Sequence, residues 1–294
     1  MIQARLFLIM ELFRKMLVKN KKLLLLIAGV TALNFTACAK NKSAAVNSNE
    51  NTIEEIKVNP QIEKLNAVLA GMSSRFKGDV HISNPEEFLN DLSKVLDSRK
   101  DFSDDDLSPF YLIDKTHTVG EDYVPLKLVH LENNANFKVN KNNLNLRPEA
   151  FNALNEMGAV AKAEGVTLTV SSTYRSYEYQ KNLFDYWVRV DGLEEAERES
   201  ARAGTSQHQL GLAMDFAPVD DAFDQTPGGQ WVYKNAASFG WSLSFPKMYE
   251  DVTGYRWESW HFRYVGIPAC QFQKKYFNNV QQYMIEFIDA WLKA

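Results

Sequence analysis

The stretch that decides the fold is Ser206-Gln207-His208-Gln209-Leu210-Gly211-Leu212-Ala213-Met214-Asp215. Its apolar residues predict a strand over residues 211–216, which Pro218 closes. A buried strand of Leu, Ala, Met and Phe has no reason to carry the carboxylate of Asp215 unless something positive meets it. His208, just before the strand, and Asp215, within it, therefore indicate a polar site beside a buried strand.

A second histidine lies in a similar apolar setting further along the chain. His261 belongs to the aromatic stretch Trp257-Glu258-Ser259-Trp260-His261-Phe262-Arg263-Tyr264, three residues after Glu258. Two imidazoles and one carboxylate satisfy zinc and leave a fourth position open for water, which is the pattern of catalytic zinc sites. His208, Asp215 and His261 are thus candidate ligands, and Glu258 is the candidate base that takes a proton from the water.

Residue spacing by itself leaves a plainer interpretation open. A single histidine such as His208 or His261 is more often an ordinary polar residue. Asp215 could cap a turn, or it could pair with Arg175 or Arg263.

Several motifs together resemble those of VanY-type D-alanyl-D-alanine carboxypeptidases. Residues 206–215 are similar to the S-x-H-x-x-G-x-A-x-D pattern of that family, and residues 258–261 match its E-x-x-H element. Ser172-Thr173-Tyr174-Arg175-Ser176 resembles the upstream S-G-Y-R-S segment, with Thr173 in place of glycine. Residues 239–241 and 253–255 resemble further landmarks. The resemblance covers roughly residues 121–266, and its elements stand in the family's order.

The resemblance implies a zinc peptidase and assigns the roles of five residues. It implies that His208, Asp215 and His261 ligate Zn²⁺ and that Glu258 is the catalytic base. It further implies that Arg175 contacts the scissile carbonyl and stabilises the oxyanion with a charge-assisted hydrogen bond.

Four residues are candidates for holding the substrate. Ser206 and Gln180 resemble residues that lie near the substrate peptide in the family. Lys247 and Arg263 could bind the terminal carboxylate of the substrate, although each is as easily a surface or structural charge.

The expected function is hydrolysis of the terminal peptide bond of peptidoglycan stem peptides by a zinc-dependent D-alanyl-D-alanine carboxypeptidase. One alternative is an L,D-carboxypeptidase or an endopeptidase of the same family. A second alternative, from another class, is a non-catalytic lipoprotein that binds the cell wall. Glu258 and Arg175 argue against that alternative, because a pure binder does not need a base.

The N-terminal residues are typical of a targeting segment and not of a folded domain. Residues 1–38 form a predicted lipoprotein signal peptide, in which a basic stub and a short apolar run lead to Cys38, the expected lipidation site. An uncleaved N-terminal anchor is the alternative, and either Met1 or Met16 is the start. Residues 39–59 form a flexible polar tether. We expect a protein of the bacterial cell envelope, bound to the membrane through this lipid anchor.

Composition and pattern set the fold class. With a net charge of −4 and a pI near 5.8, the chain has no overall positive charge that would attract nucleic acid. Helical and strand patterns mix without a regular βαβ repeat, which predicts an α+β fold with a small antiparallel sheet and flanking helices. We expect a helical region of unknown role over residues 60–120, a catalytic domain over 121–266, and a C-terminal helix over 267–294 that packs on it, its apolar stripe running from Phe272 to Leu292.

Overall fold

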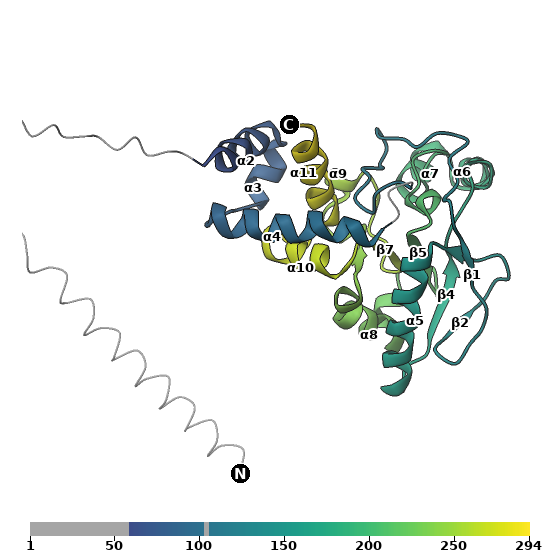
Figure 1. Cartoon of the computed structure of the whole chain (residues 1–294). Coiled ribbons are helices and arrows are strands. Elements are labelled where there is room, and N and C mark those ends of the chain that lie inside the picture. The colour runs from purple at the N-terminus through teal and green to yellow at the C-terminus, as the bar shows by residue number, and fades with distance from the viewer. Residues whose placement is uncertain (1–58, 103–105) are drawn as a thin grey trace, which may run out of the picture. The chain divides into compact units, whose positions relative to one another are not determined.

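The computed structural model describes residues 59–102 and 106–294, which belong to one compact unit (Figure 1). The predicted signal peptide, the tether before residue 59 and Cys38 lie outside the described residues. Among the helices that the structure describes, none combines the length and the apolar character that crossing a membrane requires.

A five-stranded sheet lies at the centre of the fold. In spatial order its strands are β2 (Phe137–Val139), β4 (Leu168–Ser172), β5 (Ala213–Phe216), β7 (His261–Tyr264) and β6 (Trp241–Leu243). The prediction of an α+β fold with a small antiparallel sheet is confirmed for every pair except β2 and β4, which run parallel. A separate pair joins β1 (Val129–His130) to β3 (Asn145–Leu146).

The strand predicted from residues 211–216 is the middle strand of this sheet. All four residues of β5 are buried, because β4 and β7 flank its edges and apolar side chains cover it. Helix α5 (Pro148–Ala163) begins with a proline in its first turn and buries Leu154, Met157 and Ala161 against the sheet. Its Gly158 lies where a Cβ would come within 2.8 Å of the Asn136 carbonyl oxygen, so the close approach requires glycine.

Further helices lie between β4 and β7 in the chain. They are α6 (Tyr177–Asp191), α7 (Leu193–Glu199), α8 (Pro227–Asn235), α9 (Glu250–Thr253) and the 3₁₀ helices η2 (Gln207–Leu210), η3 (Phe223–Gln225) and η4 (Ala236–Phe239). Helix α8 begins with Pro227 in its first turn, where the Thr226 side chain accepts from the Gly229 backbone N–H and caps the helix.

The prediction of a single C-terminal helix over residues 267–294 is wrong. The structure divides this segment into α10 (Ile267–Tyr276) and α11 (Gln281–Lys293). Asn278 and Asn279 lie between them with φ of 52° and 59°. These left-handed conformations end the helix, and asparagine tolerates them better than most side chains do.

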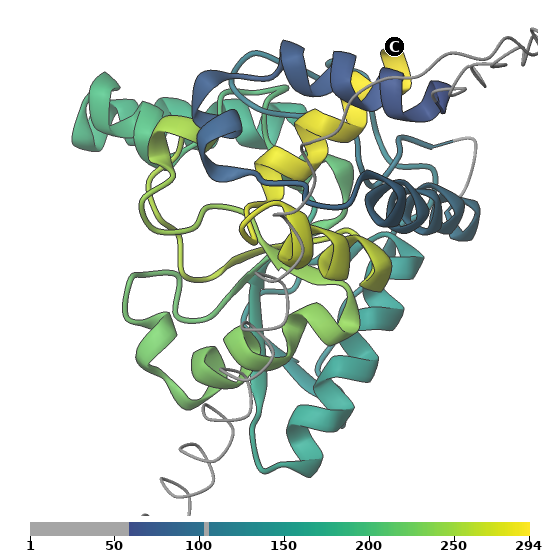
Figure 2. The ribbon, with the colours of Figure 1, turned by 90° about the vertical axis from the view of Figure 1, so that its left-hand side faces the viewer.

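The N-terminal helices share a second core with the C-terminal pair. They are α2 (Pro60–Gly71), α3 (Ser74–Asp79), α4 (Pro85–Asp97) and the 3₁₀ helix η1 (Ser98–Asp101). Figure 2 shows them beside α10 and α11, drawn in yellow. Fully buried Phe88 packs its ring 5.0 Å from that of Phe272 and 5.2 Å from that of Phe287. The helical region that begins at residue 60 therefore packs with the C-terminal helices as part of the same compact unit.

Candidate metal centre and active site

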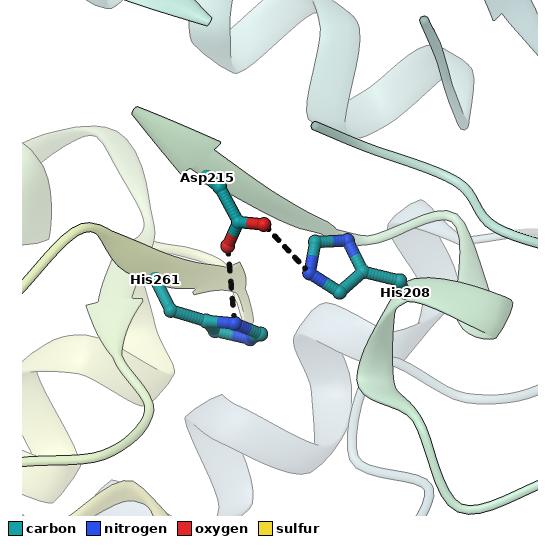
Figure 3. A group of neighbouring side chains, drawn as sticks. All are labelled: His208, Asp215 and His261. Atoms are coloured by element: carbon teal, nitrogen blue, oxygen red, sulfur yellow. Dashed lines mark ion pairs between the residues drawn. The ribbon is translucent and has the colours of Figure 1, made fainter. Parts of the chain in front are cut away.

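Two of the candidate ligands come from neighbouring strands. Asp215 in β5 and His261 in β7 are directly paired across the antiparallel ladder, so their side chains leave the same face of the sheet. Asp215 Oδ1 lies 3.2 Å from His261 Nδ1 (Figure 3). Both residues are buried.

The third ligand is brought to the same point by a tight turn. His208 lies in η2, whose first turn is capped by Ser206 and which ends at Gly211 with a φ of 68°. The Nδ1 of His208 donates to the Thr173 carbonyl oxygen at 2.7 Å, so its Nε2 carries the free lone pair. That Nε2 lies 3.3 Å from Asp215 Oδ2, as Figure 3 shows.

The three side chains fit a metal ion by distance and by hydrogen bonding. Their ligand atoms all lie within 4.8 Å of one another. Atoms about 2.0–2.1 Å from a tetrahedral zinc ion would lie roughly 3.3 Å apart, close to the 3.2 and 3.3 Å separations found here. His208 Nε2 and Asp215 Oδ1 are buried without a hydrogen-bond partner. Since buried polar atoms normally have partners, these two atoms indicate a metal site.

The surroundings of His208 and Asp215 keep both side chains in the protonation state that binds a cation. Burial, together with the nearby charge of Arg175, lowers the pKa of His208 to about 4 and keeps its imidazole neutral. Burial would raise the pKa of Asp215, but His208 and Arg175 hold it well below its usual range. Burial opposes protonation of His261, yet its contacts with the carboxylates of Asp215 and Glu258 outweigh it and raise the pKa to about 9. A metal at the site would have to displace that proton.

Glu258 lies beside the ligands in the turn that precedes β7. It is buried, and its Oε2 is 3.2 Å from His261 Nδ1. Burial raises the pKa of the Glu258 carboxyl above its ordinary value. A carboxylate with a raised pKa next to a metal position is suited to accept a proton and later return it.

Arg175 completes the charged cluster. Its Nη2 donates to Asp215 Oδ2 at 2.6 Å. Asp215 therefore pairs with Arg175 and also lies beside both histidines. Nε donates to Ser172 Oγ at 2.9 Å and Nη1 to Gln180 Oε1 at 3.3 Å. The guanidinium is thereby fixed at the edge of the cluster, where it can donate to a developing oxyanion.

The cluster opens into a cavity of about 340 Å³. Ser206, His208, Asp215, His261, Glu258 and Arg175 all line it. Its other walls include the aromatic side chains of Phe245, Tyr255 and Trp260. Phe245 packs its ring 4.7 Å from the imidazole of His261 and so limits how that ligand can turn.

Comparison with known proteins shows which family the chain resembles. Residues 143–267 match the family model described as VanY, D-alanyl-D-alanine carboxypeptidase. The YodJ protein of Bacillus subtilis strain 168 is 36% identical over 191 residues, which are 63% of this chain and 69% of that protein. The chain belongs to the VanY family.

Two further similar proteins differ in the share of their length that the chain covers. A D-alanyl-D-alanine carboxypeptidase of Enterococcus faecium is 29% identical over 48% of this chain, which spans only 45% of that enzyme. The solved structure of the LdcB LD-carboxypeptidase is 35% identical, with a TM-score of 0.52, over 60% of this chain and 84% of that one.

Of the two residues expected near a VanY substrate, one lines the cavity and the other does not. Ser206 lines the cavity, and its Oγ accepts from the His208 backbone N–H at 3.3 Å. Gln180 is fully buried instead, and its side chain holds Arg175 and donates to the Ala201 carbonyl oxygen at 2.7 Å. Thr173, which replaces the family's glycine, accepts from the Asn145 backbone N–H at 2.8 Å.

Neither expected carboxylate-binding candidate reaches the cavity. Arg263 is fully buried and donates to the carbonyl oxygens of Pro109 and Tyr111. Lys247 is exposed, with its ammonium 3.6 Å from the ring centroid of Trp257. The cations that line the cavity besides Arg175 are Lys141 and Arg256.

Sequence reasoning missed several cavity residues because they lie outside the motifs. Lys141 precedes the segment that matches the VanY model, as does Asp114, while Gln282 follows it in α11. Surface lysines, acidic turns and helical glutamines are common, so no local signal singles these residues out. Gln207 was missed although it lies between Ser206 and His208, and its side chain contacts His261.

Proposed function

We propose that this chain is a zinc-dependent carboxypeptidase that removes the terminal D-alanine of peptidoglycan stem peptides. The observation that carries the proposal is the convergence on one cavity of three candidate ligand atoms, two of them without a hydrogen-bond partner, with a buried carboxyl and a fixed guanidinium. Membership of the VanY family supports the reaction class. The cavity has room for the end of a peptide chain.

The donor set favours zinc as the metal. His208 Nε2, His261 Nδ1 and Asp215 Oδ1 would provide two nitrogens and one oxygen and leave the side toward the cavity open. A zinc ion bound there supplies a Lewis acid and lowers the pKa of a water molecule.

The reaction then depends on two residues of this chain. Glu258 accepts a proton from the attacking water and returns it to the amine of the leaving D-alanine. Arg175 donates to the carbonyl oxygen as negative charge develops on it, which requires one of its donors to turn from Asp215 toward the substrate. Ser172 and Gln180 hold the remaining donors of Arg175 in place.

Hydrolysis of an L,D bond is the second candidate. The structure of the LdcB LD-carboxypeptidase is 35% identical and is matched over 84% of its length, more fully than the Enterococcus faecium enzyme is. The two activities use the same catalytic groups and differ in which stem peptide the cavity accepts.

Product analysis separates the candidates. Zinc-loaded protein would be incubated with pentapeptide, tetrapeptide and tripeptide stems, and the products would be identified by mass. Release of D-alanine from the pentapeptide supports the main proposal, and release from the tetrapeptide alone supports the L,D activity. Cleavage within the cross-bridge would indicate an endopeptidase. Bound zinc with no product from any stem would favour the non-catalytic cell-wall-binding protein and would end the enzyme proposal.

We also propose that the protein works at the bacterial cell envelope, attached through a lipid on Cys38. The support comes from the sequence, in which the basic stub and the apolar run precede small residues and Cys38. Metabolic labelling with a fatty acid should mark the wild-type chain and not a Cys38→Ser variant. Equal labelling of the two would contradict lipidation at this position.

A further inference from the structure

The nitrogen of His261 that points away from the ligand cluster meets a buried amide. His261 Nδ1 faces Asp215 and Glu258, while its Nε2 lies 3.3 Å from the side-chain oxygen of Gln207. An amide oxygen only accepts, so this contact requires a proton on Nε2, and Nδ1 is then the nitrogen that a metal can bind once it displaces the second proton. Gln207 is itself buried and belongs to the turn that carries His208.

Gln207 is in turn held by two further buried side chains. Ser244 Oγ donates to Gln207 Oε1 at 2.7 Å, and Gln207 Nε2 donates to Gln281 Oε1 at 3.4 Å. Gln281 donates through its own Nε2 to the Ser242 carbonyl oxygen at 3.2 Å. Each amide therefore has a single orientation that satisfies its partners, and the chain of bonds is continuous from His261 to α11.

The far end of this chain of bonds lies outside the segment that matches the VanY model. Gln281 is the first residue of α11, whereas the matched segment ends at residue 267. The second core holds α11 in place, for example where the rings of Phe76 and Tyr283 lie 5.2 Å apart. The C-terminal helix α11 is thus connected to His261 through Gln281 and Gln207.

We propose that Gln207 is a positioning residue that fixes the tautomer and the ring orientation of His261, and that Gln281 of α11 holds Gln207 for this purpose. The proposal rests on the proposed function in that it takes His261 as a zinc ligand. Partners of this kind orient metal-bound histidines in general. A neutral amide does so here without adding negative charge beside Asp215 and Glu258.

Zinc affinity, measured by competition with a chelator, tests the role of Gln207. Gln207→Leu keeps the bulk of the side chain but cannot accept from Nε2, so we expect zinc to bind about 10–100-fold more weakly. Gln207→Glu can still accept, and we expect an affinity equal to or tighter than that of the wild type. Wild-type affinity in Gln207→Leu would overturn the proposal.

Variants in α11 test the second half of the proposal. Gln281→Leu removes the partner of the Gln207 amide but leaves Ser244 in place, so we expect a smaller loss of zinc affinity, about fivefold, the equivalent of one ordinary hydrogen bond. Asp289→Ala is the matched control two turns further along α11, because the Asp289 side chain bonds only Lys293. Equal zinc affinities in Gln281→Leu and Asp289→Ala would overturn the role of α11.

A measurement on the unmodified protein keeps the proposal testable if a variant does not fold. In the zinc-loaded wild type, ¹⁵N correlation spectra should show the proton of His261 on Nε2 and the metal on Nδ1. The opposite tautomer would overturn the role of Gln207 although zinc is bound. A wild-type chain that binds no zinc would instead overturn the proposed function itself.

Discussion

Asp215 and His261 are direct cross-strand partners at the middle of the central sheet, with Asp215 Oδ1 3.2 Å from His261 Nδ1. The backbone hydrogen bonds of two buried strands fix this separation before any metal binds. The third candidate ligand, His208, depends on a turn and on a hydrogen bond to the Thr173 carbonyl oxygen. Two candidate ligands are therefore positioned by the sheet, and one by the loop that leads into it.

Glu258→Gln should separate catalysis from metal binding. The amide keeps the shape of the side chain but cannot accept a proton, so we expect hydrolysis to fall by about 10²–10⁴-fold while zinc still binds. Activity on stem peptides and zinc content would be measured together. Glu156→Gln, on the exposed face of α5, is the control and should behave as the wild type. A Glu258→Gln enzyme with near-normal turnover would remove Glu258 from the mechanism.

Arg175→Met should impair the chemical step more than it weakens substrate binding. Removing a donor to the oxyanion costs about 10²–10³-fold in kcat. The pKa of Asp215 should also rise, since Arg175 helps to hold it down. Steady-state kinetics would separate kcat from KM, with Arg189→Met in the exposed part of α6 as control. A change in KM alone would assign Arg175 to substrate binding.

The metal-free protein should be most stable at about pH 6.5. The pKa of His208 is lowered to about 4, so as the pH falls from 6.5 toward 4 the unfolded chain takes up a proton that the folded chain does not, and stability is lost. The pKa of His261 is raised to about 9, so its contribution is complete below pH 6.5 and is lost as the pH rises through 9. This second contribution is on the order of 3 kcal/mol.

Thermal unfolding between pH 4 and 9 would check both limbs. His261→Gln should abolish the alkaline decline and leave the acid limb. Zinc loading should also remove the alkaline decline, because zinc binds the neutral imidazole. A metal-free protein with the same melting temperature at pH 6.5 and pH 9 would contradict the interaction of His261 with Asp215 and Glu258.

Phe88→Ala should destabilise the protein although it lies outside the segment that matches the VanY model. Phe88 of α4 is fully buried against α10 and α11. Removing such a side chain lowers the free energy of unfolding by about 3–5 kcal/mol. Urea unfolding would measure the loss, with Leu292→Ala as control because Leu292 is half exposed. A single unfolding transition that shifts as a whole is expected. Separate transitions would show that the N-terminal helices fold apart from the sheet.

The sequence by itself determined the central strand, the fold class and the set of candidate site residues. The apolar run over residues 211–216 placed β5 to within two residues. The ligand set His208, Asp215 and His261 could be named because a carboxylate in a buried strand and two histidines in apolar surroundings are unusual. The order of the motifs then pointed to the family that the comparisons confirm.

Only the tertiary structure decided what lies around that site. It divided the C-terminal segment into α10 and α11, which two asparagines permit but apolar spacing does not reveal. It showed that Arg263 is buried and that the buried Gln180 contacts Arg175. It also showed a hydrogen bond between Gln207 and Gln281, which are 74 residues apart in the sequence. Such contacts depend on packing between distant segments. Local pattern records which face of an element is apolar, but it does not record which other element that face meets.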